Sequence, residues 1–373
     1  MTIDIRQVVR GQVIGVAVAI AIALLSGPIS AQTAADKKIE AGWEAIRQRD
    51  GATAATIFYE ALKRYPNEPA LHYGAAAAAH LLGRETDAIV SLKRALVLNP
   101  KLTPASDLLG RIQYEQGDLD GAIATYERAL AGVTGRDAMS VRLEEWRKEA
   151  AVHSKLVERN GARFSLIFDG QADQALATRA SAVLDRAFWT ISQKIGAYPS
   201  NRVIVILYTQ QQYRDIAQAP PWSAGAFDGK IRIPVKGVQQ KLDDFDRALT
   251  HELTHAIVHG LAPRGVPAWL HEGLAGYFEP RDPVLAQRHL QQLGVVIPLA
   301  ALEGGFGRFN ADQATLAYEE SLFTVDYLMH LANGRMAVLL QALGSGQSFD
   351  TSMGQLGIRA ADFEAQVARR LRP

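Results

Sequence analysis

Two histidines and a glutamate form the pattern in this sequence that is best suited to chemistry. His251, Glu252 and His255 stand in the run HELTH, with the two histidines four residues apart. On an α-helix this spacing turns the second side chain by only about 40°, so both imidazoles can face one metal ion. Glu252 lies beside that face, where its carboxylate can take a proton from a water at the metal without being a ligand. The pattern predicts a metal site with its own acid–base group.

The helix that must present this motif is predicted over residues 242–259. Its apolar residues recur at helical spacing, and two aspartates stand in its first turn, where the helix dipole favours acids. A motif of this kind arises by chance in roughly one sequence of this composition in a hundred. Context favours a real site, because four of the nine histidines fall within 21 residues.

A catalytic zinc ion needs a third protein ligand and an open position for water. The candidates are His259, His271 and Glu272. His259 extends the same helical face, but three successive turns of one helix do not converge easily on one ion, and a histidine suits a helix C-terminus structurally. Glu272 lies on a predicted second helix, which the intervening glycines and prolines allow to fold back. His271 points about 100° away from it, so the sequence favours Glu272 as the ligand that joins His251 and His255.

The run HELTHAIVHGLAPRGVPAWLHEGLAGYFE resembles the zinc metallopeptidases of the gluzincin type. It is more closely similar to the peptidase-MA-like domains of bacterial exported proteins. The resemblance implies a zincin-like fold that hydrolyses peptide bonds, with one Zn²⁺ per chain. It implies His251, His255 and Glu272 as the zinc ligands and Glu252 as the general base.

The same resemblance places a tyrosine at position 318, which makes Tyr318 the candidate donor to the developing oxyanion. The alternative for Tyr318 is a half-buried tyrosine of the core. One position departs from the thermolysin-like pattern, which has an acid four residues after the third ligand to hold the first histidine. Gly276 stands there in this chain, so the partner of His251 must come from elsewhere.

A 34-residue period fills the first third of the chain, with small and bulky apolar residues recurring at that step. Its clearest columns are Ala54, Ala88 and Ala122, then Phe58, Leu92 and Tyr126, then Ala61, Ala95 and Ala129. The period resembles the tetratricopeptide repeat, whose helix pairs stack to bury their apolar faces. It predicts three repeats over 37–132, which dock a protein or peptide partner or serve as a spacer that supports the neighbouring domain.

Residues 136–160 are predicted to form a capping helix and linker, and residues 162–373 a mixed α/β domain. Strands are predicted at 163–168, 203–208 and 230–235, with a helix over 171–195 between the first two. The expected fold class is α+β: an all-α tetratricopeptide-repeat solenoid followed by a mixed α/β zincin-like metallopeptidase domain.

The N-terminus has the pattern of an export signal. Two arginines precede an apolar run from Val13 to Leu25, Gly27-Pro28 interrupts it, and small residues lead to Ala31. This predicts a signal peptide over 1–31 and a periplasmic or secreted protein of the bacterial envelope. The alternative is an uncleaved membrane anchor.

Composition limits the remaining partners. The 373 residues include 40 lysines and arginines against 39 aspartates and glutamates, and no cysteine. A neutral chain has no bulk attraction for nucleic acid or an anionic membrane, and thiol chemistry and disulfides are excluded. The sequence predicts an exported zinc metallopeptidase with a peptide or protein substrate. The alternative is a non-hydrolysing interaction protein that uses its repeats and has a degenerate zincin domain.

Overall fold

The computed structural model describes most of the chain from the start of the repeats to the C-terminus. The described residues are 29–132, 137–170, 173–217, 223–235, 241–279, 281–294 and 296–372. The predicted signal peptide therefore lies almost wholly outside the described residues, and its cleavage point after Ala31 falls in the first turn of the first helix. No helix in the described part of the chain is long and apolar enough to cross a membrane.

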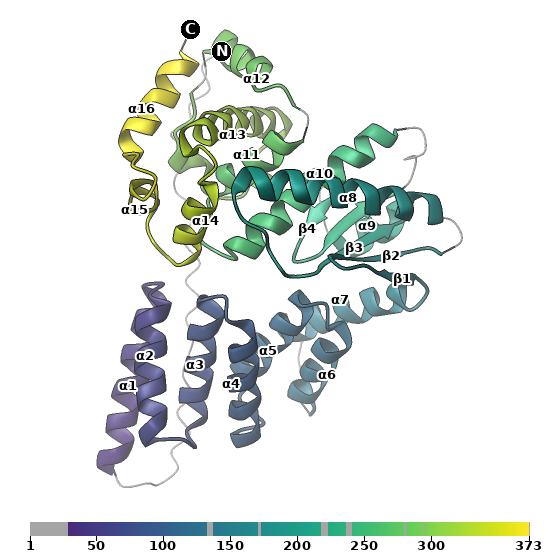
Figure 1. The fold of residues 1–373 in the computed structure, drawn as a ribbon. Helices are drawn as coiled ribbons and strands as arrows, with labels where there is room; N and C mark the ends of the chain where they lie inside the picture. The colour runs from purple at the N-terminus through teal and green to yellow at the C-terminus, as the bar shows by residue number, and fades with distance from the viewer. Residues whose placement is uncertain are drawn as a thin grey trace.

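Helix pairs form the first third of the described chain and stack side by side (Figure 1). Their helices are α1 (Ile29–Arg47), α2 (Gly51–Arg64), α3 (Pro69–Leu81), α4 (Glu85–Leu98), α5 (Thr103–Glu115) and α6 (Leu119–Leu130). The 34-residue period has a steric cause: the buried ring of Phe58 fills the space where Gly42 and Gly74 have no side chain. Tyr126, two repeats later, packs against Gly110 in the same way.

The turn inside each helix pair faces the second half of the chain. Arg49, Gly83 and Gly117, which are 34 residues apart, all have left-handed backbones, with φ of 60°, 70° and 85°. A side chain added at Gly83 would touch Pro263, and one added at Gly117 would clash with Ile204. The repeat array is therefore docked on the second region through its turns (Figure 1).

A five-stranded sheet forms the centre of the second region, with the order β1-β2-β3-β5-β4. Its strands are β1 (Val157–Asn160), β2 (Phe164–Phe168), β3 (Val203–Tyr208), β4 (Ala226–Phe227) and β5 (Ile231–Pro234). The three inner strands are parallel, and the two edge strands pair antiparallel to them. The short strand β4 is thus one edge of the sheet.

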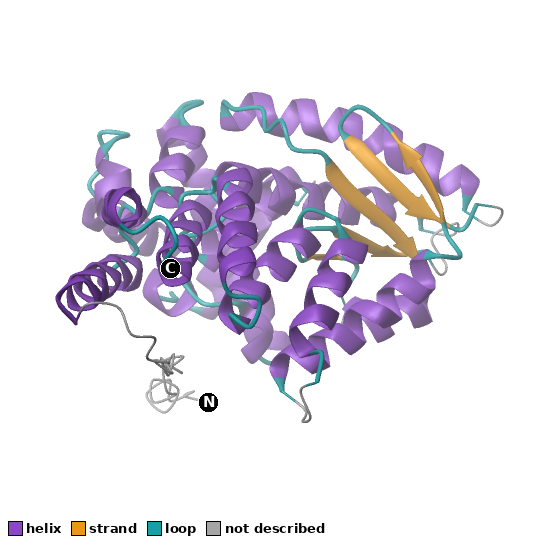
Figure 2. Cartoon of the chain, turned by 90° about the horizontal axis from the view of Figure 1, so that it is seen from below, coloured by secondary structure: helices purple, strands orange, loops and turns teal. Residues whose placement is uncertain are grey.

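Helices cover both faces of this sheet (Figure 2). In β3, Val205 and Leu207 point to a core shared with α8 (Gln174–Ile195) and α10 (Leu242–Leu261). Ile206 and Tyr208 point to the other face, which α9 (Gln210–Ala217) and the end of α7 (Ala138–His153) cover. Because both faces are buried, the strand is a continuous apolar run.

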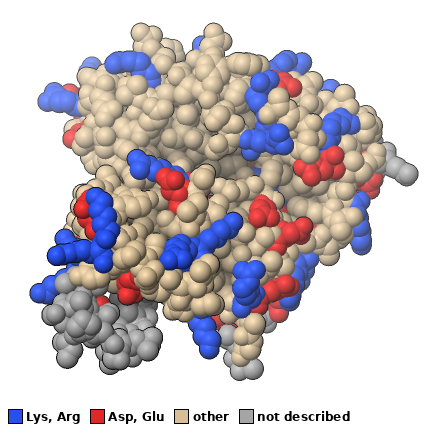
Figure 3. Space-filling view, turned by 60° about the horizontal axis from the view of Figure 1, so that its bottom comes forward, with Lys and Arg blue, Asp and Glu red and all other residues tan. Residues whose placement is uncertain are grey.

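A set of C-terminal helices closes the second region around α10. They are α11 (Ala268–Phe278), α12 (Pro283–Leu293), α13 (Ala311–Ala332), α14 (Met336–Gly344), α15 (Phe349–Gly354) and α16 (Ala360–Leu371), with short 3-10 turns at Leu299–Leu302 and Phe306–Arg308. Gly273 lets α11 approach α13 closely, since a side chain there would meet the Ser321 carbonyl and Val325. Basic and acidic side chains are interspersed on the face drawn in Figure 3, in keeping with the neutral composition.

The predicted fold class is confirmed: a helical repeat region precedes a mixed α/β region. The three predicted strands correspond to β2, β3 and β5. The prediction for 136–160 is wrong at its end, because α7 stops at His153 and β1 adds to the sheet beside β2. The four residues of β1 carry no alternating pattern, so only pairing with β2 identifies them as a strand.

Candidate metal centre

The predicted ligands come from two helices that pack against each other. α10 presents His251 and His255 one turn apart, and α11 brings Glu272 opposite them. The Oε2 atom of Glu272 lies 3.5 Å from Nε2 of His251 and 3.6 Å from Nε2 of His255. One nitrogen or oxygen atom from each of the three residues lies within 4.8 Å of the others.

These separations suit a metal ion. In a tetrahedral site with bonds of about 2.0–2.1 Å, neighbouring ligand atoms stand about 3.3 Å apart. Oε2 of Glu272 is buried and has no hydrogen-bond partner among the described residues, so an ion between the three groups would satisfy it. Two imidazole nitrogens and one carboxylate oxygen are also a donor set that zinc accepts.

Charge is concentrated at this point. Burial alone would lower the pKa of His251, but its contacts with Glu272 and Glu279 raise it to about 10. Burial would likewise raise the pKa of Glu272, but His255 and His251 hold it well below its usual range. Glu272 is therefore ionised and faces positive charge. A metal ligand must also be an ionised carboxylate.

His251 has a second carboxylate partner, although the position where the thermolysin-like pattern has an acid is occupied by Gly276. Oε2 of Glu279, at the end of α11, lies 3.2 Å from Nδ1 of His251. Glu279 is buried and is held in turn by Arg281, whose Nε atom is 3.1 Å from the same oxygen. Glu279 follows Glu272 by seven residues, which is two helical turns, so both carboxylates lie on one side of α11. This spacing is the signal that could have identified Glu279 from the sequence.

The predicted general base lies beside the ligands without being one of them. Glu252 is 6% exposed, and burial raises the pKa of its carboxyl, against the effect of His255 and His251. Its side chain packs on the backbone of Gly225, where an added Cβ would stand 2.8 Å from Cγ of Glu252. Gly225 immediately precedes β4, so the edge of the sheet meets the site at Glu252.

The comparisons with known families agree with this geometry. Residues 184–364 match the model of the Peptidase MA superfamily, and residues 39–104 and 105–137 match that of the tetratricopeptide repeat. The chain has tetratricopeptide repeats followed by a peptidase-MA-like domain. No curated protein matches the chain.

The two other histidines near the motif of the peptidase-MA-like domain are outside the ligand group. Nδ1 of His271 lies 3.3 Å from Nδ1 of His255, on the side of that ring away from Glu272. Burial lowers the pKa of His271 to about 4, so a neutral His271 can accept the Nδ1 proton of His255 and fix its tautomer. His259 packs its ring edge-on against Phe227, with 5.5 Å between the ring centres.

Tyr318 lies on α13. Its ring packs edge-on against Phe306, with centroids 5.2 Å apart. Burial, and then the charges of Glu272 and Glu252, raise the pKa of its hydroxyl above the usual range. The hydroxyl thus stays protonated, as a hydrogen-bond donor must, while its part in a reaction stays a prediction.

Proposed function

We propose that this protein is an exported zinc-dependent metallopeptidase that hydrolyses peptide bonds. The observation that carries the proposal is the convergence of His251, His255 and Glu272 with a buried, non-ligating Glu252 beside them. A structural zinc site has four protein ligands and needs no such acid, whereas a catalytic site has three and an open position. The match to the Peptidase MA superfamily over residues 184–364 supports the same assignment.

In this proposal each side chain has one task. Bound zinc would supply Lewis-acid polarisation of the peptide carbonyl and would acidify water. Glu252 accepts a proton from the attacking water and passes it to the departing amine. Tyr318 donates its hydroxyl proton in a hydrogen bond to the oxyanion that develops at the carbonyl. Glu279 and His271 orient the rings of the two histidines.

The edge of the sheet supports a peptide as the substrate. On the side away from β5, no strand of the described chain pairs with β4, and its neighbour Gly225 lies against Glu252. An extended peptide can pair with the free backbone groups of such an edge. A peptide bound there would pass directly by the proposed general base. The tetratricopeptide repeats would dock a protein partner or the remainder of a protein substrate.

Export is part of the proposal and rests on the pattern of residues 1–31. Expression of the full sequence in a bacterium, followed by fractionation and determination of the first residue, tests it. We expect the protein in the periplasm or medium, starting at Gln32. A protein that stays in the cytoplasm with residue 1 intact would contradict export and leave the enzymatic proposal standing.

Activity is tested with the purified protein and its Glu252→Gln variant, which keeps the shape of the side chain and removes the base. Zinc content and hydrolysis of a mixed peptide library are measured side by side. We expect one zinc per chain in both proteins and cleavage by the parent alone. Zinc in both with cleavage by neither would favour a non-hydrolysing interaction protein. A parent that binds no zinc would refute the ligand set.

A further inference from the structure

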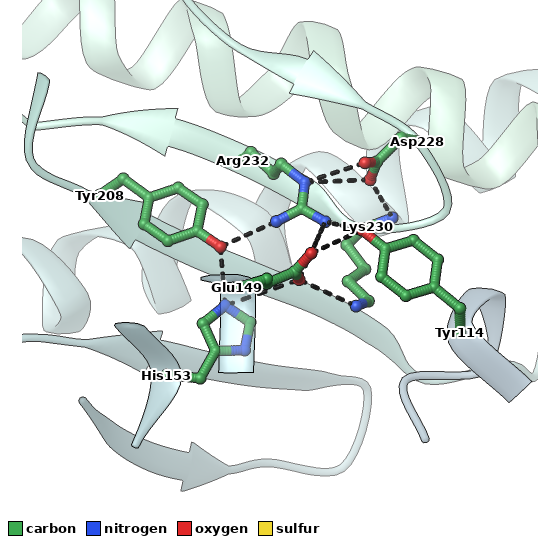
Figure 4. Close-up of polar contacts among 7 residues, drawn as sticks. All are labelled: Tyr114, Glu149, His153, Tyr208, Asp228, Lys230 and Arg232. Carbon is green, nitrogen blue, oxygen red and sulfur yellow. Dashed lines mark hydrogen bonds and ion pairs between the residues drawn. The ribbon is translucent and has the colours of Figure 1, made fainter. Parts of the chain in front are cut away.

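A cluster of charged and hydroxyl side chains joins the repeat region to the sheet (Figure 4). Four of its members are buried: Glu149, Tyr208, Lys230 and Arg232. Its side chains come from α5, from α7, from β3 and from the hairpin of β4 and β5. We call it the interface cluster, and its members are Tyr114, Glu149, His153, Tyr208, Asp228, Lys230 and Arg232. The cluster lies on the face of the sheet opposite the core that holds the zinc-ligand helix.

Arg232 is the centre of the interface cluster and is fully buried. Its Nε atom donates to both oxygens of Asp228 at 3.1 and 3.0 Å, and Nη1 donates to the Tyr208 hydroxyl at 2.8 Å. Nη2 donates to the Tyr114 hydroxyl at 2.6 Å and to the Glu149 oxygens at 3.1 and 3.2 Å. The sheet thus holds one side of the guanidinium, and the helices before it hold the other.

Glu149 is the matching acid on α7. It accepts from Tyr114 at 2.7 Å and from Lys230 at 3.1 Å, besides Arg232. Burial alone would raise the pKa of Glu149, but Arg232 and Lys230 hold it at about 2. Burying an ionised acid with two cations costs desolvation energy. Loss of one of these partners strongly destabilises the fold, because it leaves a buried charge unpaired. These charges are fully paired only while the helices and the sheet are docked as observed.

The interface cluster is one strand away from the proposed general base. In the β4–β5 pair, Arg232 stands opposite Ala226. The residue before Ala226 is Gly225, whose backbone lies against Glu252. The Gly225 carbonyl is further held by the Ser223 hydroxyl, which also accepts from Tyr213 at 3.1 Å. The edge strand is therefore fixed between Arg232 on one side and Glu252 on the other.

We propose that Arg232 is a positioning residue: docked on Tyr114 and Glu149, it sets the place of edge strand β4 against Glu252. The repeat region then forms part of the peptidase site rather than only a docking module. A peptide that pairs with β4 would be aligned correctly only while this contact is intact. The inference rests on the proposed function for its kinetic readout, and it has a second readout that needs no hydrolysis.

The variant Tyr114→Phe tests the proposed role of Arg232. This change removes the hydroxyl that bridges Arg232 and Glu149 and keeps the ring. The chain offers a matched control in Tyr126→Phe. The Tyr126 hydroxyl also donates to a carboxylate, Asp107, at 2.6 Å and also accepts from an arginine, Arg142, at 3.0 Å. Both rings pack on Trp146, at 4.9 and 4.5 Å. These contacts of Tyr126 are with α5 and α7 rather than with the sheet.

Zinc content, KM, kcat and amide hydrogen exchange of residues 223–228 are compared among the full-length parent and both variants. Coupling through a packed network of this kind changes equilibria roughly 2- to 30-fold. We expect Tyr114→Phe to raise KM by a factor in that range and to speed exchange in β4, with zinc content unchanged. We expect Tyr126→Phe to match the parent in all four. Glu149→Gln, which removes a charge, repeats the test at the same contact.

Equal behaviour of Tyr114→Phe and Tyr126→Phe in exchange and in KM would overturn the inference. So would variants at Tyr114 and Glu149 that lower only the melting temperature, because the cluster would then merely stabilise the fold. If the parent hydrolyses no peptide, the proposed function has failed. The exchange of β4 then decides by itself whether Arg232 positions the strand.

Discussion

Nδ1 of His251 lies 3.2 Å from Oε2 of Glu279, so a carboxylate seven residues beyond Glu272 holds the first histidine of the motif. The thermolysin-like pattern places this acid four residues after the third ligand, where the present chain has Gly276. Seven and four residues are both close to whole numbers of helical turns. An acid at either spacing therefore lies on the same side of the helix, where it can contact the first histidine.

Glu279→Gln should weaken zinc binding about 10- to 100-fold, since partners of this kind fix the ring orientation and raise the basicity of the ligand. Competition with a chromophoric chelator measures the affinity. Asp282→Asn is the control, because Asp282 caps α12 through the Val284 amide and the asparagine keeps that acceptor. Equal affinities in the two variants would show that Glu279 has no role in holding the metal.

His255 and His259 lie one turn apart on α10, yet only His255 faces Glu272. We expect His255→Gln to lose bound zinc and His259→Gln to keep one ion per chain. Elemental analysis of the purified proteins after dialysis measures this directly. Loss of zinc from His259→Gln, with retention in His255→Gln, would mean that the ligand set is wrong.

Removal of the Tyr318 hydroxyl should slow the chemical step without affecting the metal. Loss of one donor to an oxyanion typically costs about 10²- to 10³-fold in kcat. We expect Tyr318→Phe to show that loss with normal zinc content. Tyr327→Phe is the control on the same helix, where Tyr327 stacks on Phe363 at 5.8 Å. An unchanged kcat in Tyr318→Phe would assign Tyr318 to the core alone.

The buried carboxyl of Glu320 should make the stability of the fold depend on pH. Glu320 is not part of the candidate metal centre. It is fully buried on α13 and accepts from the Ile297 amide at 2.8 Å, and burial raises its pKa to about 8. The folded protein therefore holds this proton more tightly than the unfolded chain, in which the carboxyl titrates near 4.5. The stability that the protonated group contributes is complete below pH 4.5 and is lost as the pH rises through 8.

The Glu320→Gln variant keeps an acceptor for Ile297 and cannot ionise. Between pH 5 and pH 9 the parent should lose up to about 4 kcal/mol of unfolding free energy relative to this variant. Urea unfolding at several pH values measures the difference. Parallel pH profiles of parent and variant would show that the Glu320 carboxyl is not perturbed in the folded protein.

The grouping of the proposed ligands could be predicted from the sequence because helix geometry is local. A spacing of four residues determines how His251 and His255 are arranged, whatever surrounds them. The glycines and prolines before Glu272 allow the chain to turn back, which made Glu272 the favoured third ligand. The spacing of seven residues places Glu279 on the same side of α11 as Glu272. Its contact with His251 also depends on the position of Glu279 just beyond the last turn of α11, which the sequence pattern does not specify.

The interface cluster could not be predicted, because its members are distant in sequence. Lys230 and Arg232 alternate with Ile231 and Ile233, and such alternation ordinarily indicates a strand with one face in water. In the structure the charged face is buried, because Glu149 on α7 covers it. Only tertiary packing decides between the two outcomes.

The docked turns at Arg49, Gly83 and Gly117 also determine where foreign sequence can be placed. An insertion at any of them would push the repeat array off the peptidase-MA-like domain. The opposite ends of the same helices carry Asn67 and Lys101, which are exposed in the connections between repeats. Fluorescent labels, affinity tags or short grafted epitopes belong there, where exposed polar connections tolerate added residues. A label at Asn67 or Lys101 would report on partners of the repeats while leaving the proposed zinc site undisturbed.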